Sequence, residues 1–529
     1  MNKDFKQVLN TDETSLGIEL GSTRIKTVLI GPNAEVIASG YFDWENQLVD
    51  EVWTYKLEDV WSGIQASYAS LKQAVLDTYA VKLKYFGAIG VSAMMHGYLA
   101  FDSNKELLVP FRTWRNAMTR ESEVYLTELL NHNIPQRWSI AHLHQAMLNQ
   151  ESHVKNVDYF TTLAGYVTWQ LTGNKNIGIG DASGMFPINS KTLTYDSERV
   201  KTFNQEFSKY SLDKDLNDLL PSVLNAGELA GTLLKESVKL IDPSEDLEAG
   251  IKLAPAEGDA GTGMVATNAI LENTGNISAG TSVFAMIVLD ENLSKVYPEI
   301  DIVTTPTGSQ VAMVHVNNCT SEINSWVNIF REFSQLIDHD ISNDELYSKL
   351  LKTALSSDDD LKGILSYGYH SGENITKINI GRPLLVRKPD ANFSLSNLMR
   401  SILDSAFATL SIGLEILRDE GIEIDSIVGH GGIFKTEGVA EVVVAAAVKS
   451  PVTLMETANE GGAWGMAILA QYLNFAKDMT LDEYLNSYVF KDAKVRTYTP
   501  SEAEINAYAE YVKIYQAGLV IEATANNLV

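Results

Sequence analysis

The pattern of apolar and polar positions is nearly the same in two stretches that lie in opposite halves of the chain. Residues 17–30 read GIELGSTRIKTVLI, and residues 275–289 read GNISAGTSVFAMIVL. In each stretch an apolar run stops at a glycine that is followed by two hydroxyl residues, and a second apolar run then begins. Two short apolar runs joined by such a turn predict a β-hairpin. The chain therefore predicts one hairpin in each half, with a Gly-Ser-Thr tip in the first and a Gly-Thr-Ser tip in the second.

The residues after each hairpin predict strands and helices in alternation. In the first half, 35–44 predicts a third strand, 57–79 carries apolar side chains at helical spacing, and 86–91 predicts a buried strand. In the second half, 310–316 predicts a strand, and a helix is expected to begin near Thr320. Further helices are expected over 119–171 with interruptions, over 398–417, over 439–448 and from 500 onward with an aromatic face of Tyr508, Tyr511 and Tyr515, and a strand is expected at 426–428. This alternation indicates an α/β fold.

The composition of the two hairpin tips suggests that they bind phosphate. Glycine permits a positive φ and a close approach of ligand, and the next two residues place hydroxyls beside backbone N–H groups. A single tripeptide of this kind is a common turn. Two of them, with matched strands on both sides and about half a chain apart, indicate a duplicated domain. Two such hairpins that face each other across a cleft predict a nucleotide clamp.

Composition narrows the class of protein. A length of 529 residues is too great for one hydrophobic core and fits two domains. The net charge of −27 argues against a nucleic-acid or anionic-membrane partner, because both would be repelled. Cys319 is the one cysteine, which excludes an intrachain disulfide and a cysteine-based metal site. The N-terminus lacks the apolar segment of a signal peptide, so a cytoplasmic protein is expected.

Two glycine-rich segments add candidate chemistry. Residues 429–432, Gly-His-Gly-Gly, follow a predicted strand and precede a helix start near Thr436, which suits the adenosine end of ATP. Residues 258–261, Gly-Asp-Ala-Gly, lie between the halves, and Asp259 there could accept the proton of a substrate hydroxyl. The alternative for this segment is an ordinary turn that contains an aspartate. The two hairpins favour the catalytic interpretation.

Other patterns point to no site. The sequence contains no Walker A motif, and residues 178–184 lack the strand and helix flanks of a dinucleotide fold. His142 and His144 form a His-x-His pair without a partner at metal-site spacing, so we interpret them as structural.

Together these segments resemble the FGGY carbohydrate kinases, members of the superfamily of actin, hexokinase and the heat-shock chaperone ATPases. The resemblance runs from about Leu16 to Tyr515, and its motifs keep the family's order. The family's opening hairpin, D-x-G-T-T-S-x-K, is matched by 19–26, and its Met-His-Gly, best known in xylulose kinases, by 95–97. The other matches are Trp-Arg-Asn at 114–116, Gly-Asp-Ala-Ser-Gly at 180–184, Glu-Gly-Asp-Ala at 257–260, Gly-Thr-Ser at 280–282, Ser-Gly-Glu-Asn at 371–374, the glycine loop at 429–432 and a late helix at 460–467.

The resemblance implies a fold and a set of site residues. The expected fold is α/β with two actin-like (ribonuclease H-like) domains and an interdomain cleft: a sugar-binding domain over 1–262 and a nucleotide-binding domain over 263–529. It makes Asp259 the general base, with ATP as donor and Mg²⁺ held by Glu19 and Asp259. The residues expected to bind the sugar are Met95, His96, Trp114, Asn116, Gly258 and Asp259, and those expected to bind the nucleotide are Gly21, Ser22, Thr23, Lys26, Gly280, Thr281, Ser282, Gly431, Gly432 and Lys435.

Some positions depart from the family pattern. Glu19 stands where the family has an aspartate that positions magnesium; it keeps the charge and is one methylene longer. Met94 replaces the glutamine before Met-His of xylulose kinases, and Asn116 and Met118 replace an aspartate and an arginine. A site that loses polar partners for sugar hydroxyls should bind a different sugar, or the same sugar less tightly.

We therefore predict an ATP-dependent kinase of a small sugar, with a ketopentose such as xylulose as the first candidate. A kinase of another ketose, a polyol or a sugar acid is the alternative within enzymes. A non-catalytic, actin-like nucleotide-binding regulatory protein is the alternative from another class. The expected partner is a small-molecule sugar, with no nucleic acid and no membrane. A homodimer is compatible with the sequence, which does not fix the oligomeric state.

Overall fold

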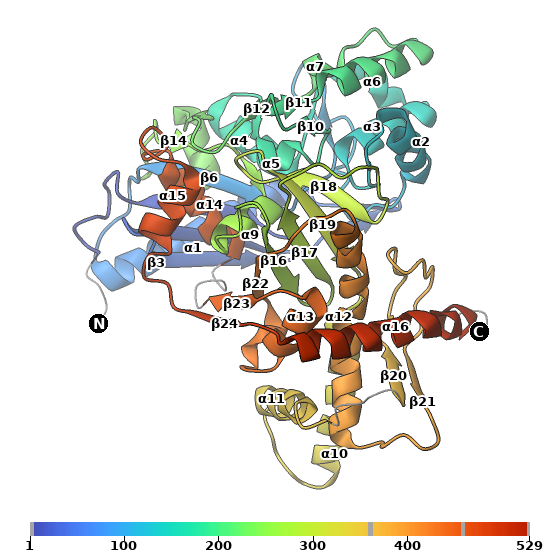
Figure 1. The fold of residues 1–529 in the computed structure, drawn as a ribbon. Coiled ribbons are helices and arrows are strands. Elements are labelled where there is room, and N and C mark those ends of the chain that lie inside the picture. Colours follow the sequence, from blue (N-terminus) through green and yellow to red (C-terminus); the bar gives the residue numbers. More distant parts are fainter. Residues whose placement is uncertain (1–4, 358–362, 456–460, 526–529) are drawn as a thin grey trace. The chain divides into compact units, whose positions relative to one another are not determined.

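The computed structural model describes residues 5–357, 363–455 and 461–525. The chain forms two compact units, and Figure 1 shows its course through both. The first unit consists of Met1–Ile270, Asp301–Val311 and Glu460–Ala493. The second consists of Leu271–Ile300, Ala312–Asn459 and Lys494–Val529.

The first unit is built on a sheet with the strand order β13-β14-β6-β1-β2-β3. β1 and β2 pair antiparallel up to Leu20 and Ile25, which confirms the first predicted hairpin, and β1 runs parallel to β6. β15 also pairs with β6, with Gly258 opposite Ala93. The strands are β1 (Ser15–Leu20), β2 (Arg24–Ile30), β3 (Val36–Asp43), β6 (Ala88–Ala93), β13 (Gly231–Thr232), β14 (Lys252–Leu253) and β15 (Glu257–Gly258).

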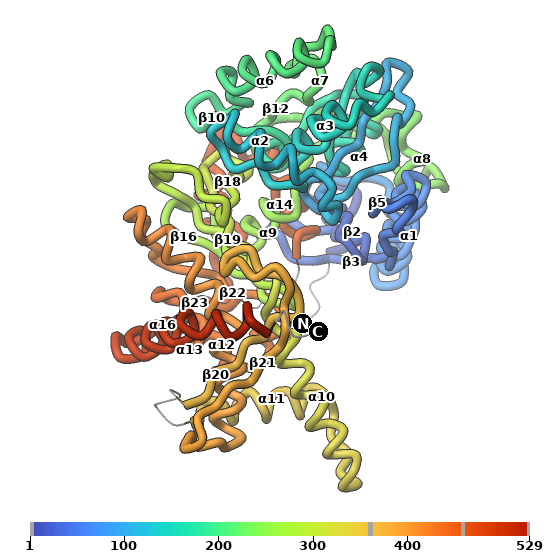
Figure 2. The backbone as a smooth tube through the Cα atoms, turned by 90° about the vertical axis from the view of Figure 1, so that its right-hand side faces the viewer, coloured from blue at the N-terminus to red at the C-terminus, as the bar shows by residue number. Residues whose placement is uncertain are grey.

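Two helices cover opposite faces of this sheet: α1 (Leu57–Tyr79) and α14 (Gly461–Tyr472). α1 packs on β2 and β3, which Figure 2 labels beside it, and Thr27 Oγ1 is 3.0 Å from Ser67 Oγ of this helix. Gly17 is paired with Val28, the neighbour of Thr27, so it points to the other face. There α14 approaches so closely that a Cβ at Gly17 would overlap the carbonyl oxygen of Ala463. The helix predicted over 57–79 is confirmed with the same bounds.

The remaining elements of the first unit form a mostly helical region and several short strands. The segment expected to be helical with interruptions over 119–171 contains three α-helices, α2, α3 and α4. The helices are α2 (Arg120–Leu130), α3 (Ser139–Leu148), α4 (Leu163–Thr172), α5 (Ile179–Ala182), α6 (Ser197–Lys209), α7 (Leu216–Leu219), α8 (Val238–Ile241), α9 (Asp259–Ala266) and α15 (Leu481–Tyr484). The short strands are β4 (Gln47–Val49), β5 (Val52–Thr54), β7 (Leu99–Phe101), β8 (Tyr159–Thr161), β9 (Asn176–Gly178), β10 (Ile188–Asn189), β11 (Thr194–Tyr195) and β12 (Ser222–Leu224).

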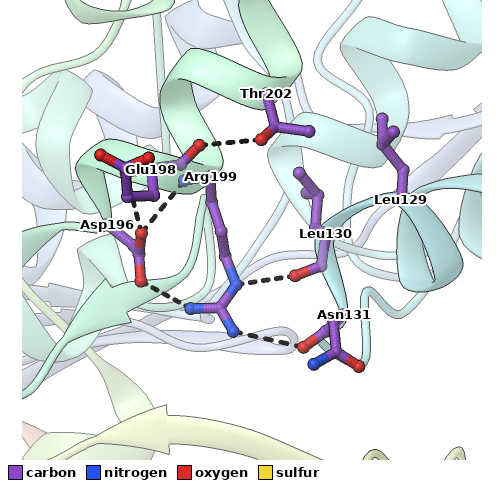
Figure 3. Close-up of a pocket in the computed structure, with 7 residues that line it drawn as sticks. All are labelled: Leu129, Leu130, Asn131, Asp196, Glu198, Arg199 and Thr202. Atoms are coloured by element: carbon purple, nitrogen blue, oxygen red, sulfur yellow. Dashed lines mark hydrogen bonds and ion pairs between the residues drawn. The ribbon is translucent and has the colours of Figure 1, made fainter.

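A surface hollow of about 320 Å³ lies between α2 and α6 in the first unit (Figure 3). Arg199 crosses it and donates from Nε to the carbonyl of Leu130 at 2.8 Å and from Nη2 to that of Asn131 at 3.2 Å. Its Nη1 is 2.6 Å from Asp196 Oδ2. Carbonyls at the end of a helix lack partners within the helix. Arg199 therefore caps α2, and the polar groups of this hollow serve the fold.

The second unit repeats the topology of the first. Its sheet contains the order β19-β17-β16-β22-β23-β24. β16 and β17 pair antiparallel, which confirms the second predicted hairpin, and β16 runs parallel to β22 just as β1 runs parallel to β6. β18 (Ile300–Thr304) begins where the chain re-enters the first unit. The other strands are β16 (Thr274–Ala279), β17 (Val283–Val288), β19 (Gln310–Val316), β20 (Ile364–Tyr367), β21 (Leu384–Arg387), β22 (Ser426–His430), β23 (Val452–Met455) and β24 (Val495–Tyr498).

Helices pack on the second sheet and on one another. They are α10 (Thr320–Leu336), α11 (Asn343–Ala354), α12 (Leu395–Asp419), α13 (Ala440–Val448) and α16 (Glu502–Ala525). The aromatic face predicted for the last helix is confirmed, because Tyr508, Tyr511 and Tyr515 are buried. The hydroxyl of Tyr508 donates to the carbonyl of Asp404 of α12 at 2.6 Å. Within the described ranges, no helix has the length and apolar character needed to cross a bilayer.

Candidate active site

Asp259 occupies the first position of α9, directly after β15. Because β15 runs parallel to β6, the carboxyl ends of the two strands meet at one edge of the sheet. Met95, two residues beyond the end of β6, donates its backbone N–H to Asp259 Oδ1 at 3.1 Å. The sheet register thus brings together the predicted base and the predicted Met-His-Gly segment.

The surroundings of Asp259 raise the pKa of its carboxyl. Desolvation by nearby protein is the largest cause, and hydrogen bonds from the backbone N–H groups of Met95 and Ala260 act in the opposite direction. The residue itself remains exposed to solvent. A carboxyl that is exposed can be reached by the hydroxyl of a bound molecule, as a general base requires.

Glu19, near the end of β1, lies close to Asp259. Its Oε2 accepts the backbone N–H of Ala463 at 3.0 Å. Burial raises the pKa of Glu19, the negative charge of Asp259 raises it further, and Ala463 and Lys26 lower it. Two carboxylates that repel each other favour a cation between them. Among the described residues, no three or more His, Cys, Asp or Glu gather into a group that could hold a metal ion.

Two buried carboxyl groups, those of Glu257 and Asp181, lie near Asp259. Glu257 accepts the backbone N–H of Asp181 at 3.0 Å and that of Gly180 at 3.3 Å. Asp181 Oδ2 accepts the hydroxyl of Thr162 at 2.6 Å. Burial raises the pKa of Asp181 to about 7 and that of Glu257 well above its ordinary value. The sequence pattern indicates a role for neither residue, although both lie in segments that resemble the family's motifs, 180–184 and 257–260.

His96 follows Met95 in a strained conformation. Its φ is 72°, in the left-handed region that side chains other than glycine rarely adopt. Its Nδ1 lies 3.3 Å from the carbonyl of Gly184, and burial together with the charge of Arg137 lowers its pKa well below the ordinary value. The ring is therefore neutral near pH 7. His96 is thus strained, buried and neutral, and it directly follows the residue whose N–H binds Asp259.

The structure gives the other two predicted sugar ligands different surroundings. Trp114 is 40% exposed. Asn116 is buried, its Oδ1 accepts the backbone N–H of Trp53 at 2.8 Å, and its Nδ2 donates to the carbonyl of Trp53 at 2.8 Å. The amide of Asn116 thus links its loop to β5. Its contact with sugar remains a prediction.

The predicted nucleotide residues fall into one group in each unit. In the first unit, Gly21 N donates to the carbonyl of Arg24 at 2.9 Å to close the tip of the hairpin, and Lys26 is paired with Glu19 across β1 and β2. The predicted residues of this group are Gly21, Ser22, Thr23 and Lys26.

In the second unit, Gly280 N donates to the carbonyl of Ser282 at 2.9 Å. The glycine loop approaches this hairpin, because a Cβ at Gly431 would overlap the carbonyl oxygen of Ala279. Gly431 has a φ of 114°, and a Cβ at Gly432 would meet no atom within 4 Å, which leaves the backbone open to a flat ligand. Lys435 ends the turn that starts at Gly432. Glu460, the first residue of the late helix segment, lies outside the described residues.

Glu373, in the segment 371–374, is buried in the second unit. Its Oε2 accepts the backbone N–H of Asn317 at 2.9 Å and Nδ2 of Asn318 at 3.3 Å, and burial raises its pKa to about 7. The folded state therefore favours the protonated form. Protonated Glu373 therefore adds to the free energy of unfolding. The gain is complete below pH 4.5, the ordinary pKa of a glutamate, and it is lost as the pH rises through about 7.

Replacing Glu373 with glutamine should make the free energy of unfolding of the second unit less dependent on pH. Glutamine keeps an acceptor for Asn317 and needs no proton, so the variant should exceed the wild type by about 2–3 kcal/mol at pH 8 and match it near pH 4.5. Urea unfolding at the two pH values measures this difference. The exposed Glu502 provides a control, since Glu502→Gln should leave the profile unchanged. Equal pH profiles for wild type and Glu373→Gln would contradict the prediction.

Comparison with known proteins gives consistent results over almost the whole chain. The model of the FGGY family of carbohydrate kinases, N-terminal domain, matches residues 14–245, and that of the C-terminal domain matches residues 275–473. The xylulose kinase of Haemophilus influenzae is 23% identical and is aligned over 94% of this chain and 98% of its own. That of Staphylococcus xylosus is 19% identical, over 95% and 98%.

Solved structures share the fold. A ligand-bound xylulose kinase from Lactobacillus acidophilus has a TM-score of 0.78 at 18% identity and covers 97% of this chain and 99% of its own. A gluconate kinase from the same organism has a TM-score of 0.79 at 17% identity, over 98% and 99%. A Plasmodium falciparum glycerol kinase with ADP has a TM-score of 0.76 at 14% identity, over 96% and 98%. These likenesses confirm the predicted α/β fold of two actin-like units.

Proposed function

Because the chain belongs to the FGGY family of carbohydrate kinases and is a sugar kinase, we propose that it transfers the terminal phosphoryl group of ATP to a hydroxyl of a ketopentose such as xylulose. The observation that carries this proposal is the bond from Met95 N–H to Asp259 Oδ1 at 3.1 Å. It places the Met-His segment directly beside a carboxylate that can accept the proton of the attacking hydroxyl. Phosphoryl transfer depends chiefly on such positioning and on charge neutralisation.

The choice of a ketopentose is supported by the curated relatives. The relatives from Haemophilus influenzae, Staphylococcus xylosus, Escherichia coli and Bacillus subtilis are all xylulose kinases. The structures of similar fold include gluconate and glycerol kinases. Sugar acids and polyols therefore belong in any test, together with other ketoses.

Each residue has a defined part in the proposed reaction. Asp259 accepts the proton of the sugar hydroxyl, while the bond from Met95 fixes the direction of its carboxylate. His96, neutral and held by Gly184, offers a ring nitrogen to the sugar. The two hairpin tips hold phosphate oxygens through backbone N–H groups and hydroxyls. Glu19 and Asp259 would hold Mg²⁺, whose charge offsets that of the phosphates.

An assay of ADP release tests this function. Mg²⁺-ATP is supplied with a panel of ketopentoses, ketohexoses, polyols and sugar acids, and ADP is measured by a coupled optical readout. A ketopentose should raise ADP release well above background in the wild type and not in Asp259→Asn. If another class of sugar gives the largest kcat/KM, the substrate assignment is wrong. If ATP binds and no sugar of the panel raises turnover, the result indicates a substrate outside these classes or a non-catalytic nucleotide-binding role.

A further inference from the structure

The backbone carbonyls of the first hairpin tip are all held by two aromatic residues. Trp44 Nε1 donates to the carbonyl of Gly21 at 2.7 Å, and its backbone N–H donates to that of Thr23 at 3.1 Å. The hydroxyl of Tyr55 donates to the carbonyl of Ser22 at 2.6 Å. The two rings are stacked with centroids 4.2 Å apart, and both residues are buried. Three consecutive carbonyls are thus fixed on one side of the tip.

Fixing these carbonyls also fixes the amides. In a trans peptide the N–H points away from the C=O of the same plane. The bonds to Gly21 and Ser22 therefore turn the N–H groups of Ser22 and Thr23 away from the aromatic pair. Throughout the described part of the chain, neither N–H has an acceptor. Two amides and two hydroxyls are left for an anion.

The second hairpin tip is held in the same way by different groups. Thr320, the first residue of α10, donates to the carbonyl of Gly280 from its backbone N–H at 3.1 Å and from Oγ1 at 2.8 Å. Cys319 N–H donates to the carbonyl of Thr281 at 2.9 Å. The N–H groups of Thr281 and Ser282 are turned away and, within the ranges that the structure describes, have no acceptor. In both units, donors from elsewhere in the chain hold the carbonyls of the hairpin tip, although the donor residues differ in type between the units.

We propose that Trp44 and Tyr55 in the first unit and Thr320 in the second are positioning residues. They bind the carbonyl side of each hairpin tip and thereby orient its amides toward the phosphates of ATP. The inference rests on the proposed function, since it takes the hairpins as the phosphate sites. These residues act through the tip backbone and have no role in binding the sugar.

In the first unit, Tyr55→Phe removes one hydroxyl and keeps the ring stacked on Trp44. The dissociation constant for Mg²⁺-ATP, measured by calorimetry without sugar, should rise roughly tenfold, since losing one oriented hydrogen bond to a charged group has that order of effect. KM for ATP should rise with it, and KM for sugar should not change. Tyr68→Phe is the matched control, because the buried hydroxyl of Tyr68 has no partner among the described residues, and both constants should stay as in wild type.

In the second unit, Thr320→Val removes Oγ1 at nearly constant shape, and Thr320→Ser keeps it. ATP binding should weaken in the valine variant and return to the wild-type value in the serine variant. Unchanged ATP binding in both Tyr55→Phe and Thr320→Val would overturn the proposal, as would equal rises in KM for ATP and for sugar. A third result separates the two proposals: the variants weaken ATP binding, but the wild type turns over no sugar. That result would overturn the proposed function and leave the positioning role intact.

Discussion

Replacing Asp259 with asparagine is expected to lower kcat by roughly 10³-fold, the usual contribution of a general base. Asparagine has the same shape, and its Oδ1 can still accept the N–H of Met95, which lies at 3.1 Å from the aspartate oxygen. The variant cannot take a proton from the sugar hydroxyl and brings no negative charge to the metal. KM for sugar should change little, since the Met95-His96 segment stays in place.

The pH dependence of the wild type offers a second test of Asp259. Protonated Asp259 cannot act as a base, so kcat/KM should fall as the pH is lowered toward the pKa of this carboxyl. Its surroundings raise that pKa above the ordinary 3.8. In the wild type, the fall of kcat/KM on the acid side should therefore have its midpoint above pH 3.8. The residual activity of Asp259→Asn should show no such fall. A variant that keeps a tenth or more of wild-type kcat would show that Asp259 is not the base.

The sequence alone predicts much of the fold, because periodicity is local. The sequence predicts a strand at 310–316 and a helix at 57–79, and the structure gives both elements these bounds. Both hairpins could be predicted from glycine and hydroxyl residues between apolar runs. Turn chemistry and alternation need no knowledge of distant contacts.

The contacts that shape the candidate site depend on residues far apart in the chain. Glu257 accepts the N–H of Asp181 across 76 positions, and no local pattern indicates that both carboxyls are buried together. The amide of Asn116 is engaged by Trp53 across 63 positions, so a residue predicted to contact sugar also supports a strand. The anchoring of the first tip by Tyr55 likewise spans 33 positions. Residue type indicates what a side chain can do, and only packing decides which partner it has.

Replacing Gly17 with alanine should destabilise the first unit by about 3 kcal/mol or more. A Cβ at this position would overlap the carbonyl oxygen of Ala463 and lie 2.6 Å from the backbone N of Ala467. Both are backbone atoms of α14, so no change of side-chain rotamer can relieve the overlap. α14 itself is confined on its other side, where Gly465 packs so closely on Thr262 of α9 that a Cβ would overlap its carbonyl.

The same substitution should also impair catalysis in the fraction that folds. Moving α14 away from β1 withdraws the N–H of Ala463 from Glu19, and with it one of the groups that hold this carboxylate near Asp259. Denaturant unfolding measures the loss of stability, and kcat with saturating Mg²⁺-ATP measures the loss of catalysis.

Gly31→Ala, just beyond β2, is the matched control, because its Cβ would come no closer than 3.3 Å to the movable ring of Phe5. We expect a cost below about 1 kcal/mol there, the range of ordinary substitutions that create no overlap. Equal stability of the two variants would mean that β1 and α14 can separate without cost, and that their close contact does not set the position of Glu19.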